Sequence, residues 1–176
     1  GAGVDKVAMV LGHHGEEVEA AVRPFPITLV RNPSPDDGQA SSVRLGLQSL
    51  SPRLDAVIVA LADQPLIDAQ DIVVLISAFR KRGEAPMVVP RVRRADGATE
   101  PGNPVIFDAA LREEWLAGAA DLACRKWRER HPGRVSWFDT DNQRYALDVD
   151  TPEDLDRFAA STGHRLSWPA AYANSA

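Results

Sequence analysis

Apolar residues in this 176-residue chain fall into short runs separated by segments of helical periodicity. The runs predict strands near residues 6–11, 24–30, 55–63, 87–90, 105–107 and 135–138, with a further extended segment at 144–150. Apolar residues at helical spacing predict helices near 15–22, 41–50, 67–82, 109–116 and 120–130, and a last helix from Thr151. Strands that alternate with helices predict an α/β fold with a mostly parallel sheet.

Chain length predicts one domain, over residues 1–162, followed by a C-terminal tail at 163–176. The charged, glycine-containing segment 91–102 is expected to be a mobile excursion over one edge of the sheet. The formal net charge is −5 and the basic residues form no stripe, so neither nucleic acid nor an anionic membrane is expected as a partner. The absence of a signal peptide and the single cysteine, Cys124, predict a cytoplasmic protein.

The most informative stretch is the apolar run that leads from Asp55 to Asp63, with Pro65 directly after it. A strand that ends at an acid places a carboxylate beyond the carboxyl end of the sheet, where open α/β sheets bind ligands. One interpretation is that Asp63 holds a cation. The other is that it only turns the chain or caps a helix. These residues alone do not decide between the two.

A second acidic pair, Asp148 and Asp150, stands two residues apart at the end of an extended segment. That spacing predicts that both side chains leave the chain on the same face. Mg²⁺ prefers one or two carboxylates completed by phosphates and water, and Asp63 together with Asp150 fits that preference. The alternative is that the pair helps to cap the last helix. For that helix, Thr151 is predicted as the N-cap and Asp154 as part of a capping box.

The segment around Gly38, Ser41 and Ser42 offers backbone amides and hydroxyls that could meet a ribose or a phosphate. Taken alone, these residues favour the plainer interpretation of a serine N-cap behind a flexible loop. The sequence contains no nucleophilic triad, no zinc spacing and no glycine-rich dinucleotide fingerprint.

Four segments, in this order, resemble the MobA-like nucleotidyltransferases, and most closely their molybdenum cofactor cytidylyltransferase branch. They read DGQASSVRLGL at 37–47, ADQPL at 62–66, GNPVIF at 102–107 and DVDTPEDL at 148–155. The resemblance covers about residues 3–160. It implies a three-layer, Rossmann-like, nucleotide-diphospho-sugar transferase-like fold with helices on both faces of the sheet.

The resemblance also implies a Mg²⁺-dependent enzyme that transfers CMP from CTP to a molybdopterin-type cofactor and releases pyrophosphate. A molybdoenzyme is the expected recipient of the product. Asp63 and Asp150, with Asp148 beside them, correspond to the metal-binding acids. The remaining implied site residues bind substrates: Gly38 and Ser42 in the segment that touches the nucleotide, Asn103 on the acceptor side, Asp121 and Arg125 in a motif matched farther along the chain, and Ala62 beside Asp63.

Two departures from the family pattern change these expectations. The family's opening glycine-rich loop, its lysine and the strand before them do not occur in this sequence. The chain is therefore expected to be either an N-terminally incomplete, inactive fragment of a longer enzyme or an enzyme that a real truncation has disabled. The resemblance favours CTP over GTP as the nucleotide, although the missing loop also helps to distinguish the two. In the segment 119–125, alanines also replace two glycines of related sequences, which points to a different acceptor.

Two other functions remain open at this stage. One is a degenerate, non-catalytic domain that binds a nucleotide, a cofactor or a partner enzyme. The other is a nucleotidyltransferase that acts on a sugar phosphate or another phosphorylated acceptor.

Overall fold

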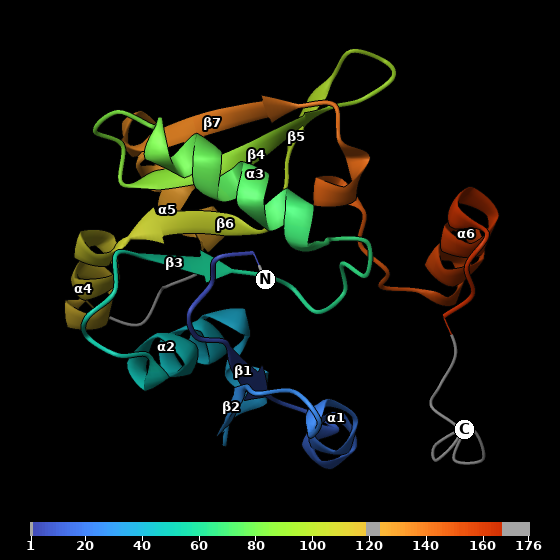
Figure 1. Ribbon diagram of the computed structural model, residues 1–176, viewed down its shortest axis with the longest axis horizontal. Coiled ribbons are helices and arrows are strands. Elements are labelled where there is room, and N and C mark those ends of the chain that lie inside the picture. The colour runs from blue at the N-terminus through green and yellow to red at the C-terminus, as the bar shows by residue number, and fades with distance from the viewer. Residues whose placement is uncertain (1, 119–123, 167–176) are drawn as a thin grey trace.

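The computed structural model describes residues 2–118 and 124–166, whose strands and helices are labelled in Figure 1. The strands are β1 (Ala8–Leu11), β2 (Thr28–Arg31), β3 (Ala56–Val59), β4 (Met87–Arg93), β5 (Thr99–Pro101), β6 (Val105–Asp108) and β7 (Val135–Thr140). The α-helices are α1 (Gly15–Val22), α2 (Gln39–Ser49), α3 (Ala69–Arg80), α4 (Ala109–Ala117), α5 (Cys124–Arg130) and α6 (Pro152–Thr162). Three short 3₁₀ helices are η1 (Pro35–Asp37), η2 (Pro132–Arg134) and η3 (Gln143–Ala146).

The strands of the described residues form two sheets. β1 and β2 pair in parallel, whereas the larger sheet runs β3–β6–β4, with β5 and β7 both paired to β4. The α/β class is confirmed, but the pairing is mixed rather than mostly parallel. β4 and β7 are parallel, while β6 is antiparallel to both β3 and β4. Apolar runs do not reveal strand direction, because buried strands of either orientation have the same composition.

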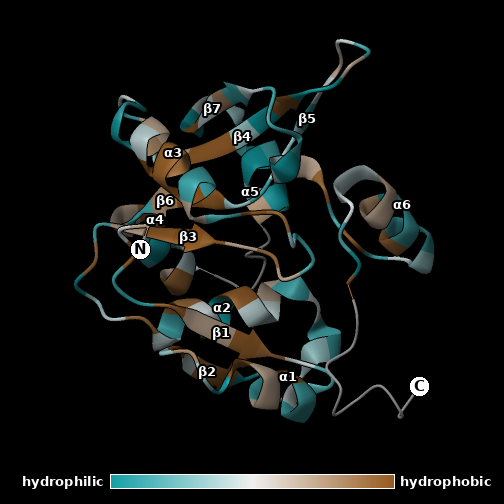
Figure 2. Cartoon of the chain, turned by 45° about the vertical axis from the view of Figure 1, so that its right-hand side comes forward, coloured by the Kyte–Doolittle hydropathy of each residue, from teal (hydrophilic) through white to brown (hydrophobic). Residues whose placement is uncertain are grey.

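Side chains of β4 and β6 alternate between two apolar clusters, which makes the larger part a three-layer structure. Val88 and Ile106 pack with Leu75 and Phe79 of α3 on one face. The opposite face contributes Met87, Val89, Val105 and Phe107 to a cluster with residues of α2, α4 and α5. Figure 2 shows these hydrophobic strands between the helices. The predicted helices on both faces of the sheet are therefore confirmed.

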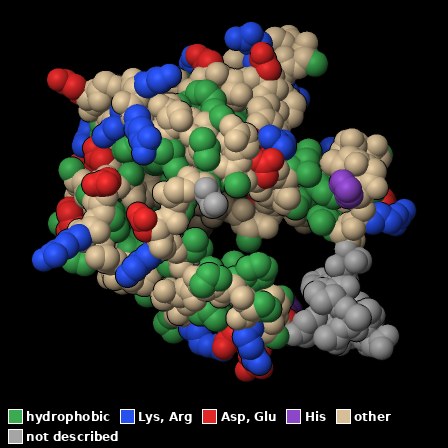
Figure 3. Space-filling view, in the orientation of Figure 1, with side chains coloured by type: hydrophobic (Ala, Val, Ile, Leu, Met, Phe, Trp, Pro, Cys, Tyr) green, Lys and Arg blue, Asp and Glu red, His purple; other side chains and the backbone are tan. Residues whose placement is uncertain are grey.

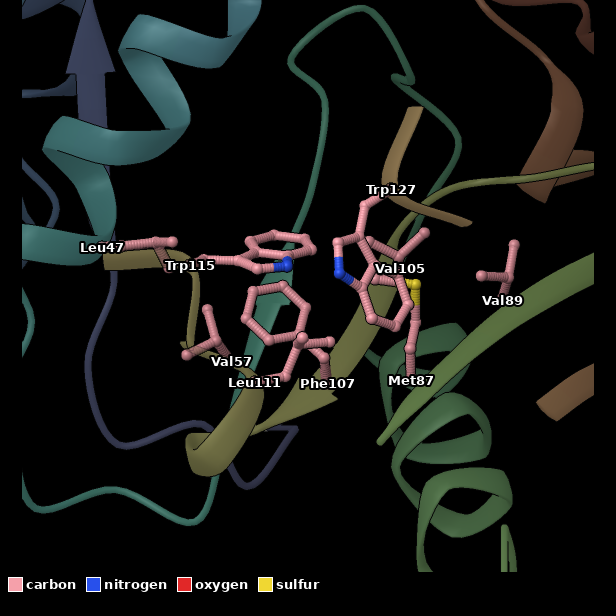
Figure 4. Packing of buried hydrophobic residues seen from close by; sticks show 9 residues of the cluster. All are labelled: Leu47, Val57, Met87, Val89, Val105, Phe107, Leu111, Trp115 and Trp127. Atoms are coloured by element: carbon pink, nitrogen blue, oxygen red, sulfur yellow. The ribbon is translucent and has the colours of Figure 1, made fainter. Parts of the chain in front are cut away.

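Three aromatic rings fill the centre of the larger cluster, as Figure 4 shows. The ring centroids of Phe107 and Trp115 are 4.7 Å apart, and those of Trp115 and Trp127 are 5.9 Å apart. Trp127 also stacks on His131, at 4.8 Å. These contacts fix α4 and α5 on the sheet, and thereby fix α5 beside the carboxyl end of β3.

Three predicted segments differ in the structure. The strand expected to reach Asp63 ends at Val59, and the chain continues without regular structure. The segment 91–102 is a β-hairpin rather than a mobile excursion, because β4 runs on to Arg93 and pairs with β5. The extended segment expected at 144–150 begins as η3.

The start of α6 follows the prediction closely. Thr151 caps the helix, Asp154 completes the capping box, and Pro152 occupies the first turn. Figure 1 shows α6 at the side of the molecule, away from the larger sheet. The tail prediction for 163–176 falls mostly outside the described residues. No helix in the described part of the chain combines the length and the apolarity needed to cross a membrane.

Trp115→Ala is expected to lower the free energy of unfolding by about 3–5 kcal/mol, because it leaves a cavity between Phe107 and Trp127. Trp115→Phe should cost much less, since the Trp115 indole nitrogen is buried without a hydrogen-bond partner. Urea unfolding of both variants measures the difference. Trp137→Ala, at a position 36 % exposed, is the control. Equal losses for Trp115→Ala and Trp137→Ala would contradict the assignment of the core.

Candidate active site

Two segments that are far apart in the sequence meet beyond the end of β3. The backbone amide of Val149 donates to the carbonyl of Asp63 at 2.9 Å. The side-chain amide of the neighbouring Gln64 donates to the Asp148 carboxylate at 3.2 Å and to the Tyr145 carbonyl at 3.1 Å. These bonds place Asp148 and Asp150 alongside Asp63, as the sequence predicted.

The segment that carries Asp148 and Asp150 is anchored to α3 by Tyr145. The Tyr145 side chain is 1 % exposed, and its hydroxyl donates to the backbone carbonyl of Asp71 at 2.7 Å. The Asp71 carboxylate, also buried, accepts from Asn142 at 2.8 Å and from Arg144 at 2.7 Å. Asp71 additionally completes the capping box of α3 with Asp68. Tyr145 is therefore anchored to the N-terminus of α3, which the Asp68–Asp71 capping box stabilises.

Asp63 is held in a position that disfavours its negative charge. Burial, followed by the carboxylates of Asp148 and Asp150, raises the pKa of Asp63 above its ordinary value. Its Oδ1 atom is buried and has no hydrogen-bond partner among residues 2–118 and 124–166. A buried carboxylate oxygen of this kind costs stability unless a cation or a proton compensates it. A divalent cation beside Asp63 would provide this compensation.

Such a cation would need further ligands. In the described residues, no three His, Cys, Asp or Glu side chains are arranged to hold a metal ion by themselves. This agrees with the mode in which Mg²⁺ is held by one or two carboxylates and completed by phosphate oxygens and water. The metal role of Asp63, Asp148 and Asp150 stays a prediction that this geometry supports.

Helix capping does not account for these acids, although Asp63 does lie in a turn, as the alternative interpretation expected. Asp68, not Asp63, caps α3. Thr151 and Asp154 cap α6, and Asp150 takes part only through its backbone amide, which donates to Asp154 at 3.1 Å. The side chains at 63 and 150 are therefore not needed to end or begin a helix.

Asn103, predicted to contact the acceptor, is joined to the same anchor. Its backbone amide donates to the Tyr145 carbonyl at 2.8 Å, the oxygen that also accepts from Gln64. The preceding Gly102 permits this approach, because a Cβ atom there would lie 2.6 Å from the Tyr145 oxygen. The Asn103–Pro104 peptide bond is cis.

Asn103 also lines a pocket of about 230 Å³ between α2, the segment after β3, and α5. The predicted residue Arg125 lines it too, together with Gln39 and Arg128, which the sequence interpretation missed. Arg128 lies three residues after Arg125 on α5, so helical spacing could have grouped the two guanidinium groups on one face. Gln39 could not have been found this way, because its place depends on how α2 packs. Figure 3 shows the surface hollowed between the part formed by β1, β2 and α1 and the body that carries the larger sheet.

The predicted nucleotide-side residues lie at the start of α2. Gly38 precedes the helix with φ of 86°, a backbone conformation that favours glycine, and no side chain caps the helix. The predicted serine N-cap is therefore wrong. Ser41 and Ser42 instead accept hydrogen bonds from the buried Asn32 side chain, at 2.8 and 3.0 Å.

Two further predicted residues add little to the geometry. Ala62 is exposed between β3 and Asp63. Asp121 lies outside the described residues.

Without added metal, Asp63→Asn is expected to stabilise the protein at pH 7. The raised pKa of Asp63 means that its ionisation opposes folding as the pH rises through the folded-state pKa. The gain should shrink as the pH falls, and should vanish below the pKa of the unfolded state, near about 4. Urea unfolding with a chelator at several pH values tests this expectation. Asp156→Asn, at an exposed position, is the control. Destabilisation by Asp63→Asn at pH 7 would contradict the interpretation that the ionised Asp63 side chain opposes folding.

Gly102→Ala is expected to lower the free energy of unfolding by about 1–3 kcal/mol, because the added methyl group collides with the Tyr145 carbonyl. Gly133→Ala is the matched control, since a Cβ atom there meets nothing within 4 Å and the glycine has no positive φ. Thermal and urea unfolding of the two variants should differ clearly. Equal stabilities would show that the loop does not depend on this contact.

Comparisons with known proteins identify the family and support the fold. The profile of the MobA-like NTP transferase domain matches residues 1–135, which is more than half of the chain. The crystal structure of Rv0371c from Mycobacterium tuberculosis H37Rv has a TM-score of 0.69 and 27 % sequence identity, over 90 % of this chain and 77 % of that one. Its complex with manganese gives a TM-score of 0.68 and 26 % identity, over 92 % and 80 % of the two chains.

A third structure extends the likeness in fold alone. It is the 4-diphosphocytidyl-2C-methyl-D-erythritol synthase from Anaerococcus prevotii DSM 20548, with a TM-score of 0.70 and 16 % identity over 92 % of this chain and 80 % of that one. A search of curated protein sequences finds no significant match. The molybdenum cofactor branch therefore stays a prediction, whereas the family does not: the chain belongs to the MobA-like NTP transferase domain family.

Proposed function

We propose that this domain transfers a cytidylyl group from CTP to a phosphorylated acceptor of the molybdopterin type. The observation that carries the proposal is the buried, unpartnered Oδ1 atom of Asp63 beside Asp148 and Asp150. A nucleotidyltransferase must gather negative charge from a triphosphate and an acceptor phosphate at one point. Acidic side chains at that point are useful only together with a divalent cation.

In the proposed reaction, an oxygen of the acceptor phosphate forms a bond to the α-phosphorus of CTP. The bond from that phosphorus to the bridging oxygen breaks, and pyrophosphate leaves with the electron pair. When bound, Mg²⁺ would neutralise charge on the transferred and leaving phosphates. The protein contributes alignment: Asp63 and Asp150 hold the cation, the start of α2 meets the nucleotide, and Asn103 and Arg125 face the acceptor.

Two features support a cation in this role. The residues supply carboxylate oxygens only, which suits Mg²⁺ or Mn²⁺ rather than zinc. The M. tuberculosis relative has been crystallised as a manganese complex. The acceptor is less constrained, because a sugar phosphate fits the family and the polar groups of the pocket equally well.

Asp63→Ala is expected to reduce pyrophosphate release from CTP and a pterin phosphate acceptor by about 100-fold or more, because the cation loses a ligand. The assay uses the protein as its gene encodes it, alongside residues 1–176 alone, with Mg²⁺ and with Mn²⁺. Asp156→Ala is the control and should retain full activity.

The other outcomes separate the alternatives. Turnover of a sugar phosphate but not of the pterin would show that the acceptor is a sugar phosphate. Faster turnover of GTP than of CTP would show that the transferred nucleotide is guanylyl. CTP binding without turnover of any acceptor would favour a non-catalytic domain. Activity that survives Asp63→Ala would overturn the proposed cation site.

A further inference from the structure

The pocket beside the carboxylate site has walls of two different kinds. Val43 of α2, together with Val59 and Leu61 at the end of β3, supplies apolar surface. On the polar side are the two guanidinium groups of α5 and the side-chain amides of Gln39 and Asn103. No carboxylate lines it among the described residues. A few convergent polar groups against apolar walls are typical of a small-molecule site.

Arg128 carries a positive charge that the described part of the protein does not neutralise by contact. No described carboxylate lies within ion-pair distance of its guanidinium group, although other arginines are paired, as in Arg91 with Asp139 and Arg134 with Glu114. Burial lowers the pKa of Arg128. Arg125 acts in the same direction, while Glu129 opposes it. A half-buried cation without a contacting anion is costly, and an anionic ligand would remove that cost.

Arg125 leaves a second guanidinium group available on the same helix face. In the described part of the chain it pairs with Glu129, at 3.0 Å, and both side chains are largely exposed to solvent. Surface pairs of this kind contribute little stability. Burial raises the pKa of the Cys124 thiol, which also lines the pocket, to about 11. The thiol is therefore neutral at pH 7 and adds no negative charge that would repel an anion.

The chemistry of these groups selects among anions. Guanidinium groups present fixed, paired N–H donors that match the oxygens of a phosphate. A phosphate monoester carries close to two negative charges near pH 7, which two guanidinium groups can balance. The apolar wall of Val43, Val59 and Leu61 suits the carbon body of an ester better than a free inorganic ion.

We propose that this pocket binds a phosphate monoester, with Arg128 as the anchor of its phosphate and Arg125 as the second cation. The proposal deepens the proposed function and rests on it only for the assumption that this ester is the acceptor. Leu61 lines the pocket and Asp63 follows two residues later, so the ester would lie next to the carboxylates.

The test measures binding of phenyl phosphate, inorganic phosphate and phenol by calorimetry at constant ionic strength, without metal or nucleotide. We expect both phosphates to bind, phenyl phosphate more tightly, and phenol not to bind. Arg128→Gln should weaken phenyl phosphate binding by about tenfold or more, since it removes charge-assisted hydrogen bonds. Arg130→Gln makes the same change in charge on the same helix, outside the pocket lining, and should leave affinity unchanged.

Arg128→Lys is a control for misfolding of Arg128→Gln, because lysine keeps the positive charge but loses the paired N–H donors. It should bind with an affinity between those of the wild type and Arg128→Gln. Equal affinities of Arg128→Gln and Arg130→Gln, or no phosphate binding by the wild type, would overturn the proposal.

The two proposals fail in different experiments. Phosphate binding that depends on Arg128 stands even if no CTP turnover is found. Conversely, CTP turnover with an acceptor KM that Arg128→Gln does not change would overturn the assignment of this pocket to the acceptor and leave the transferase intact.

Discussion

The backbone carbonyl of Tyr145 is the point on which the candidate site depends. It accepts from the side chain of Gln64 and from the amide of Asn103, while the hydroxyl of the same residue bonds to α3 through the Asp71 carbonyl. Three chain segments are thereby held to one buried residue. Because a buried carbonyl must keep its hydrogen bonds, none of the three can shift without cost. Gly102 is the local condition for this arrangement, since any side chain there would occupy the space of the carbonyl.

Charge is distributed unequally around this anchor, and the contrast between the buried Asp71 and the partly buried Asp63 shows how. Asp71 is buried, but Asn142 and Arg144 satisfy its carboxylate, so it serves the structure. Asp63 has acidic neighbours instead, and one of its oxygens has no partner. Structural stability alone would favour a partner or a neutral residue at 63. On the other side, no carboxylate of the described residues contacts the cationic Arg128. Positive and negative side chains that lack ion-pair partners and lie near one another are typical of a ligand-binding site.

Local signals in the sequence predicted well, and non-local ones did not. The capping box of α6 and the apolar face of α3 depend on residues a few positions apart, and both were found. The direction of β6 and the pairing of β5 depend on contacts between distant segments, so apolar runs could not reveal them. The meeting of Asp63 with Asp148 and Asp150 was predicted from strand ends that gather at one edge of a sheet. The acids do meet, but not at strand ends, because β3 stops at Val59 and residues 147–150 have no regular structure. Arg128 could have been grouped with Arg125 by its helical spacing, but Gln39 could not have been found, because only packing brings α2 beside α5 and the segment after β3.

The two proposed sites are connected by hydrogen bonds to one shared backbone atom. Gln64, next to Asp63, and Asn103, in the wall of the pocket, bond to the same carbonyl oxygen. A cation held by Asp63 and a phosphate held by Arg128 would therefore be positioned relative to one fixed atom. Displacement at phosphorus requires the attacking and leaving oxygens to lie nearly in line, and holding reactants in such a geometry can supply about 7–11 kcal/mol of the barrier reduction. A site that forms no covalent intermediate depends on this alignment, so the packing around Tyr145 is part of the proposed mechanism as well as of the fold.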